Sequence, residues 1–415
     1  MIKILKEKTH SILRWSEKYI KTDMVYLAKG GFWLTSNQLV ASASAFLLSI
    51  VFANLLPKEI FGLYKFILSI TSILVISTLY GIDSSIMQAT ARGIEGDFKS
   101  GLKTKIRWGF IGAIASLAIT GYYLIHHNYI FSLYFLIVAI FLPFYDTFGI
   151  YNSLLMGRKN FSKATQFGIV ELTIELIILI LAVLFYKNVA FLIFCYFFSR
   201  TIIKIYFYIR TLKKYPPNSN GDSNTITYGK HLSAMSVISG IAKYLDEILV
   251  FHFIGPAALA TYALATAPAG QINGTLGQIK NLILPKYAQA DHEKAKSGII
   301  KKMIQFGGII LIITLIYILL APILFKLIFP KYMESVFYSQ VYAFTNISLI
   351  ALIPSTFLQA KKEIKKLYTL NFVNPILNIV IMIVAVQFGL IGLIIGRVFS
   401  SIVNTIYITY LAKRA

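Results

Sequence analysis

Runs of predominantly apolar residues, each about 20 residues long, recur along the whole of this 415-residue chain. Each run is long enough to cross a hydrocarbon core of roughly 30 Å as an α-helix, which satisfies its backbone hydrogen bonds internally. Hydrophobic residues make up 57% and charged residues 14%, whereas about a quarter of a soluble domain is charged. The chain is therefore predicted to be an all-α polytopic membrane protein.

We predict about twelve spanning helices, near residues 31–54, 62–85, 107–125, 129–152, 166–186, 188–210, 229–253, 257–282, 303–324, 337–359, 368–387 and 389–411. Lys and Arg are concentrated in alternate loops, which begin near Met87, Leu154, Thr211, Leu284 and Ala360. The positive-inside rule then predicts a multi-pass protein of the cytoplasmic (inner) membrane with both termini cytoplasmic. This distribution also explains the net charge of +23 without a nucleic-acid partner.

The chain is predicted to comprise a leader and two six-helix halves. Residues 1–30 form a basic amphipathic leader that would lie on an anionic leaflet. The N-terminal half spans 31–212 and the C-terminal half 229–415. Between them, 213–228 is rich in Pro, Gly and polar residues and is predicted to be a flexible cytoplasmic linker.

The halves repeat at offsets near 200 residues. VFANLLP, Val51–Pro57, matches VFHFIGP, Val250–Pro256, and the Lys-Ser-Gly at 99–101 recurs at 296–298. An even number of helices per repeat predicts a pseudo-twofold axis along the membrane normal, with a central cavity between the halves. In such transporters one half rocks against the other to give alternating access.

Charged side chains lie deep within the span predicted at 229–253, which contains Lys243, Asp246 and Glu247. A charge at the middle of a membrane helix costs roughly 2.5 to 3.5 kcal/mol on insertion scales, so it usually faces a wet cavity or an opposite charge. Lys243 and Glu247 are four residues apart and can pair on one helical face. These charges either hold neighbouring helices together or line a transport cavity. We favour the cavity because the next span is also polar.

We predict that the first two helices of each half line a water-filled cavity. Arg397 should lie level with Asp246 and form a cluster with the other charges in the outer half of the membrane. Lys65 and Lys280 lie near helix ends, where we favour snorkelling to the interface and a place in the cavity is the alternative. Cations in such a cavity suit an anionic substrate, especially a diphosphate. The predicted lining residues are Asn37, Gln38, Lys243, Asp246, Glu247, Gln271, Asn273, Gln278, Lys280 and Arg397.

Two intramembrane ion pairs are predicted in the N-terminal half, Glu175 with Arg200 and Glu171 with Lys204. In each helix the two charges are four residues apart, and the opposite charges match in depth at 1.5 Å of rise per residue. The second repeat has Asn374 and Asn378 in place of the glutamates, which favours a structural role. Proton coupling through Glu175 is the alternative. Asp83 and Asp146 are expected to link helices by hydrogen bonds.

Catalytic motifs are absent from the sequence. There is no Walker A pattern, no HExxH, no zinc-spaced Cys/His set and no nucleophile elbow, and the single Cys195 allows no internal disulfide. No enzymatic activity, cofactor or metal site is therefore predicted.

Five segments, in this order and spacing, carry a resemblance to a known family. They are LAKGGFW at 27–33, ANLLPKEIFGLY at 53–64, GIDSSIMQATAR at 81–92, LLMGRKNFSKATQ at 154–166 and YLDEILVFHFIGPAALATYALA at 244–265. The chain resembles the Wzx-type flippases of O-antigen and capsule repeat units, in the multidrug, oligosaccharidyl-lipid and polysaccharide exporter superfamily.

This resemblance implies an undecaprenyl-diphosphate-linked oligosaccharide as substrate, moved from the cytoplasmic to the outer leaflet during biosynthesis of surface polysaccharide such as lipopolysaccharide. It also implies alternating access coupled to H⁺ or Na⁺, contact with membrane lipids, and other polysaccharide assembly proteins as partners. Two alternatives remain. A MATE-type drug or cation exporter would share the fold, but the intramembrane cations argue against it. A membrane glycan polymerase or ligase usually needs a large outward loop, and none is predicted.

Overall fold

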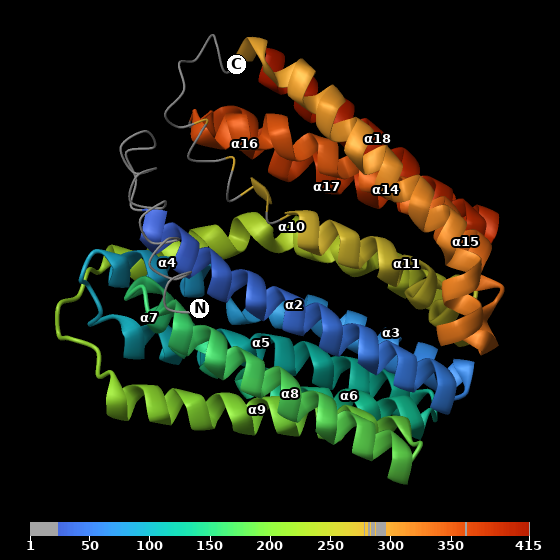
Figure 1. The fold of residues 1–415 in the computed structure, drawn as a ribbon. Helices are drawn as coiled ribbons and strands as arrows, with labels where there is room; N and C mark the ends of the chain where they lie inside the picture. Colours follow the sequence, from blue (N-terminus) through green and yellow to red (C-terminus); the bar gives the residue numbers. More distant parts are fainter. Residues whose placement is uncertain are drawn as a thin grey trace, which may run out of the picture.

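The computed structural model describes residues 24–414, apart from 278, 281–282, 284–286, 288–295 and 362. Most of the predicted leader therefore lies outside the described residues, as does Gln278. Every regular element within the described residues is helical, and Figure 1 shows long helices running roughly parallel across the molecule.

The helices up to the linker are α2 (Met24–Leu55), α3 (Lys58–Leu74), η1 (Val75–Thr78), α4 (Gly81–Ala91), α5 (Phe98–Ile125), α6 (Tyr129–Tyr145), η2 (Thr147–Gly149), α7 (Ile150–Gly157), α8 (Phe161–Phe185) and α9 (Val189–Lys214). Asparagine side chains cap three of them. Asn128, Asn160 and Asn188 each accept a hydrogen bond from a backbone N–H in the first turn of α6, α8 and α9, where those groups lack an intrahelical partner.

The helices after the linker are α10 (Asn224–Phe253), α11 (Pro256–Gly277), α14 (Ile299–Ile328), η3 (Pro330–Tyr332), α15 (Ser335–Tyr342), η4 (Ala343–Ala351), α16 (Leu352–Ala360), α17 (Ile364–Ala385), η5 (Val386–Phe388) and α18 (Gly389–Lys413). The predicted spans coincide with these helices or with consecutive helical pieces, so the all-α polytopic fold is confirmed.

Nine stretches of the described residues are long and apolar enough to cross a membrane, and one of them, Lys365–Lys413, contains both α17 and α18. Neither α10 nor α11 is among the nine, and these are the two helices whose polar residues predicted a wet cavity. The span predicted at 62–85 is a broken helix. Leu79 takes a positive φ of 61° between η1 and α4, a conformation that is uncommon for a residue other than glycine.

Two close approaches bring helices from distant parts of the chain together. Gly62 of α3 faces the start of α11, where an added Cβ would lie 1.8 Å from the Pro256 carbonyl oxygen. Gly81 of α4 faces α10 in the same way, with an added Cβ 2.4 Å from the Gly229 carbonyl oxygen. Small residues allow two helix backbones to pack this closely. Close van der Waals packing then holds the helices together in lipid, where the hydrophobic effect does not drive their association. Both α10 and α11 thus pack directly on helices of the N-terminal part.

The end of the bundle near Pro57, Pro256 and Phe329 is the outer end in the predicted topology, and contacts between distant helices close it. Asn54 Nδ2 donates to the Ile328 carbonyl at 2.9 Å, and Lys331 Nζ donates to the Asn54 carbonyl at 2.6 Å. In Figure 1, α3, α11, α14 and α15 lie close together at this end, whereas α16 and α17 diverge from α2 and α4 toward the inner end.

An ion pair reinforces the same closure. Lys58, at the start of α3, pairs with Glu334, which also accepts a hydrogen bond from Thr261 at 3.3 Å. Glu334 lies outside the spans. Partial burial raises the pKa of its carboxyl, but the hydrogen bond and the charge of the Lys58 ammonium lower it by more, so the net shift is downward. The carboxylate therefore remains ionised near neutral pH.

The linker, which its composition predicted to be flexible, makes specific hydrogen bonds to a neighbouring loop. Residues 215–223 lie against the loop between α4 and α5, where Glu95 and Gly96 N–H both donate to the Asn220 carbonyl, at 3.0 and 2.7 Å. Arg158 binds both oxygens of Glu95 at 2.6 Å, and the Asn218 N–H donates to the same carboxylate at 2.9 Å. The linker is thus held by hydrogen bonds to groups of another loop, and such contacts cannot be predicted from the composition of the linker itself.

We expect Glu95→Gln to release the linker, because a neutral amide cannot replace the two charge-assisted bonds to Arg158. Hydrogen–deuterium exchange at the amides of Glu95, Gly96 and Asn218 should then rise at least about tenfold, the equivalent of roughly 1.4 kcal/mol. Exposed Lys99→Gln in the same region is the control.

This contact should also depend on pH. Hydrogen bonds from Arg158 hold the pKa of the Glu95 carboxyl below its ordinary value. The stabilisation is therefore present above the unfolded pKa of about 4.3 and is lost as pH falls through the lower folded value. Unchanged amide exchange in Glu95→Gln at neutral pH would show that the linker is held in another way.

Candidate functional site

A central cavity of about 600 Å³ lies among α2, α3, α10 and α11, with single residues from α9, α15 and α18. These include all four helices predicted to line it. The charged side chains around it are Lys65, Lys243, Asp246, Glu247 and Arg397. Three positive and two negative groups give this lining a net charge of +1.

Arg397 of α18 forms an ion pair with Asp246 of α10. Its Nε and Nη2 lie 2.9 and 2.8 Å from the same oxygen, Asp246 Oδ2, and Nη2 also donates to the Ala242 carbonyl at 3.3 Å. The Tyr262 hydroxyl of α11 donates to Asp246 as well. Asp246 is 5% exposed, so this contact joins three helices through a buried carboxylate.

The expected pairing of Lys243 with Glu247 does not form. Glu247 accepts a hydrogen bond from Ser69 of α3, whereas the Lys243 ammonium lies 5.1 Å from the centre of the Tyr244 ring. Lys65 lines the cavity 5.8 Å from the Phe61 ring, so the snorkelling interpretation was wrong for it. Within the described residues, no carboxylate lies within 4.0 Å of the ammonium of Lys65 or Lys243.

Aromatic residues form much of the remaining wall. Tyr64, Tyr196, Tyr262 and Tyr342 line the cavity, together with Phe52 and Phe61, and Gln271 adds an amide. The sequence interpretation missed the tyrosines because 26 of them are spread along the chain and no spacing marks these four. Rings of this kind offer both an apolar face and a polar hydroxyl to a ligand.

Several predicted lining residues lie elsewhere. Asn273 donates to Asn346 Oδ1 at 2.8 Å and does not line the cavity, and neither does Lys280. Gln38 donates to Ser42 at 3.5 Å along α2, while Asn37 lines a second cavity. Gln278 falls outside the described residues. The sequence correctly identified these residues as polar, but the prediction placed the side chains of the described ones on the wrong face of the helix.

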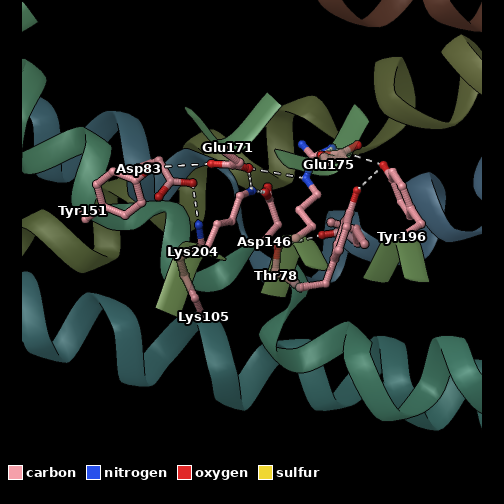
Figure 2. Close-up of polar contacts among 12 residues, drawn as sticks. Thr78, Asp83, Lys105, Asp146, Tyr151, Glu171, Glu175, Tyr196 and Lys204 are labelled. Atoms are coloured by element: carbon pink, nitrogen blue, oxygen red, sulfur yellow. Dashed lines mark hydrogen bonds and ion pairs between the residues drawn. The ribbon is translucent and has the colours of Figure 1, made fainter. Parts of the chain in front are cut away.

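A network of buried and partly buried charges lies in the N-terminal half, toward the end that the predicted topology places inside, and Figure 2 shows it converging from several helices. It borders the second cavity, of about 420 Å³. The members are Asp83 (α4), Lys105 (α5), Asp146 (between α6 and η2), Glu171 and Glu175 (α8), and Arg200 and Lys204 (α9).

The predicted ion pairs are part of this larger network. Arg200 lies 3.5 Å from Glu175 and 3.8 Å from Glu171, and Lys204 lies 3.7 Å from Glu171. The direct partner of Lys204 is Asp146, which the depth argument did not include. Both predicted pairs therefore form, and two further contacts, Arg200 with Glu171 and Lys204 with Asp146, join them into one network.

Lys105 is the member that the sequence interpretation missed. It is 0% exposed and lies 2.5 Å from Asp83, so this pair links α5 to α4. Asp83 and Asp146 thus connect helices as expected, through cations rather than neutral donors. The only sequence signal for Lys105 was its place among the basic residues at the start of a span, where solvent exposure is the usual outcome.

The network makes a test of partner choice possible. Lys204→Met should destabilise the protein by about 3–5 kcal/mol, because it leaves Asp146, whose side chain is 21% exposed, without its direct cation. Adding Asp146→Asn should restore most of that loss, and adding Glu171→Gln should restore less. Thermal midpoints in detergent would measure this double-mutant cycle.

Lys187→Met, in the exposed turn between α8 and α9, is the control substitution. Equal recovery from Asp146→Asn and Glu171→Gln would show that Lys204 does not discriminate between the two carboxylates.

Comparison with known sequences identifies a family. A profile described as polysaccharide biosynthesis protein matches residues 27–289. An uncharacterized membrane protein of Methanocaldococcus jannaschii is 23% identical over 422 residues, covering 91% of this chain and 82% of the relative.

Solved structures share the fold. The lipid II flippase MurJ in an inward closed conformation matches with a TM-score of 0.73 and 13% identity, covering 93% of this chain and 87% of that chain. An outward-facing multidrug resistance MATE family transporter of the MOP superfamily matches with a TM-score of 0.57 and 13% identity, covering 93% of this chain and 95% of that chain. At this identity the likeness concerns the fold.

Proposed function

Because the family profile covers more than half of its length, this chain belongs to the polysaccharide biosynthesis protein family, and on that premise we propose that it is a flippase. The proposed substrate is an undecaprenyl-diphosphate-linked oligosaccharide repeat unit. It would cross the cytoplasmic membrane for assembly of a surface polysaccharide of the O-antigen or capsule type, with both protein termini cytoplasmic and other assembly proteins as partners. No catalytic step is assigned to the chain.

The charge of the central cavity is the observation that carries this proposal. A positively charged pocket inside a membrane helix bundle is costly unless water or an anionic ligand solvates it. Lys65 and Lys243 line the pocket without a described carboxylate at ion-pair distance, whereas the charge of Arg397 is already matched by Asp246. An anion entering the cavity therefore meets two lysines and one carboxylate, Glu247, which together carry a net charge of +1.

We assign the diphosphate to Lys65 and Lys243. A lysine ammonium is a compact charge with three donors and holds phosphate oxygens in many geometries. Arg397 keeps a positioning role, because it ties α18 to α10 next to the ligand. The surrounding tyrosines can stack on sugar rings and donate to hydroxyls, which suits the oligosaccharide.

Two matched double variants test this assignment. Lys65→Gln with Lys243→Gln changes the net charge of the cavity lining from +1 to −1, while Arg397→Gln with Asp246→Asn removes a balanced pair and leaves +1. Charge-assisted hydrogen bonds are worth roughly 1.5–3 kcal/mol each, so the lysine variant should bind the lipid-linked diphosphate at least about 100-fold more weakly. The balanced variant should lose much less.

Binding and flipping of a fluorescent undecaprenyl-diphosphate oligosaccharide in proteoliposomes would measure both effects, with exposed Lys187→Gln as the control. Equal losses in the two double variants would contradict the assignment to the lysines. Transport of an organic cation with no binding of the diphosphate would instead favour the MATE-type exporter.

Ion-coupled alternating access is the proposed mode, and the buried network is the proposed ion site. Its four carboxylates exceed its three cations by one charge, so a proton or a monovalent cation would complete neutrality. Glu175 is the candidate acceptor, because its Oε2 is buried and accepts no hydrogen bond.

A short path connects this network to the substrate cavity. Arg200, the partner of Glu175, donates to the Tyr196 hydroxyl at 3.2 Å, and Tyr196 lines the central cavity. Protonation of Glu175 would remove one of the two carboxylate charges near Arg200. The hydrogen bond from Arg200 to Tyr196 would then change.

Glu175→Gln should therefore abolish the dependence of flipping on an imposed H⁺ or Na⁺ gradient, because a permanently neutral side chain cannot exchange a charge. Binding of the lipid-linked substrate should change by less than about threefold, because Glu175 does not itself line the central cavity. Flipping rates in proteoliposomes with each gradient imposed separately would measure the coupling and identify the ion.

Glu59→Gln, an exposed carboxylate in the first turn of α3, is the matched control. Full gradient dependence in Glu175→Gln would remove this residue from the coupling mechanism.

A further inference from the structure

The outward face of α9 carries a continuous apolar stripe. Phe194, Phe198, Ile202, Tyr206 and Ile209 are between 42% and 54% exposed, and their spacing of three or four residues places them on one helical face. Phe194 and Phe198 stack with ring centres 5.4 Å apart. A stripe of this kind on a membrane helix faces lipid chains.

The stripe runs directly into a basic pocket at the inner end of α9. This pocket, of about 540 Å³, is lined by Tyr206, Ile209, Arg210, Lys213 and Lys214. Three of its five lining residues are cationic and none is acidic. Lys213 follows Arg210 by three residues, so both side chains lie on the same face as the stripe.

Two contacts restrict the position of the Arg210 guanidinium. Its Nη1 donates to the Tyr206 hydroxyl at 3.1 Å, and its Cζ lies 5.7 Å from the centre of the Phe167 ring. The hydrogen bond to Tyr206 uses Nη1 and leaves the donors on Nε and Nη2 available to a ligand. Aromatic packing reduces the entropy that a long side chain loses when it binds.

Acidic residues near this end are engaged elsewhere. Glu95 binds Arg158, and Asp97 accepts from the Asp222 N–H at 2.6 Å. Within the described residues, no ion pair involves Arg210, Lys213 or Lys214. The basic pocket therefore has three cations available at the level where lipid headgroups lie.

We propose that this face of α9 binds an anionic phospholipid, with the phosphodiester at Arg210 and Lys213 and one acyl chain along Ile202 and Phe198. The twelve residue-to-residue steps from Phe198 to Arg210 span roughly 18 Å at 1.5 Å each, slightly more than the ~15 Å of one leaflet. A soluble phosphate would use the cations but gain nothing from the stripe, whereas a phospholipid uses both. This site is separate from the central cavity and does not depend on the proposed transport function.

Native mass spectrometry of the detergent-purified full-length protein would test the proposal, with phosphatidylglycerol as probe and zwitterionic phosphatidylcholine for comparison. Arg210→Gln with Lys213→Gln should weaken phosphatidylglycerol binding about 10- to 30-fold, at roughly fivefold per cation at a membrane surface, and leave phosphatidylcholine binding unchanged. Lys301→Gln with Lys365→Gln, two exposed lysines on α14 and α17, is the matched control and should have no effect.

A second variant guards against misfolding. Lys213→Gln alone changes an exposed side chain and should weaken phosphatidylglycerol binding about fivefold with an unchanged thermal midpoint. Equal losses in the control pair, or equal losses for both lipids, would overturn the proposal. Competition by millimolar glycerol 1-phosphate would also overturn it, because the pocket would then take a soluble anion rather than a lipid.

Discussion

The bilayer core offers no water to an unpaired amide or charge, and the architecture of this protein depends on that constraint. Helices satisfy the backbone within each span, so the chain consists of long helices joined by short turns. Side-chain charges need partners, and the N-terminal half supplies them by gathering acids and cations into one network. Lys105 with Asp83, Lys204 with Asp146 and Arg200 with Glu175 allow six charges to remain inside the bundle.

The same constraint separates the buried network from the central cavity. Each cation of the network contacts a carboxylate, whereas Lys65 and Lys243 face the cavity without a described acid at ion-pair distance. Unpaired charge persists in a membrane protein only where water or a ligand can solvate it. A ligand with two phosphates would supply that solvation. Tyr196 contacts both regions, since it lines the cavity and accepts from Arg200.

The two parts of the chain meet the cost of buried polar groups differently. After the linker, neutral amides make several of the contacts between helices, beside the ion pair of Arg397 with Asp246. Asn374 donates to Asn404 between α17 and α18, and Asn273 donates to Asn346 between α11 and η4. A neutral amide pair needs no compensating charge and costs less to bury than an ion pair. The contacts most suited to binding or releasing an ion are therefore concentrated before the linker.

The sequence by itself determined that the chain is helical, where most helices begin and end, and which helices are polar. Those properties follow from local hydropathy over about 20 residues. It also predicted that Glu171 and Glu175 lie level with Arg200 and Lys204, since rise per residue is constant. Only the tertiary structure decided the rotation of each helix about its axis. That rotation turned Lys65 into the cavity, turned Asn273 out of it and placed Asp146 beside Lys204. Lipid chains are as apolar as leucine, so an apolar face packs equally well against lipid or another helix, and the apolar pattern alone does not distinguish the two.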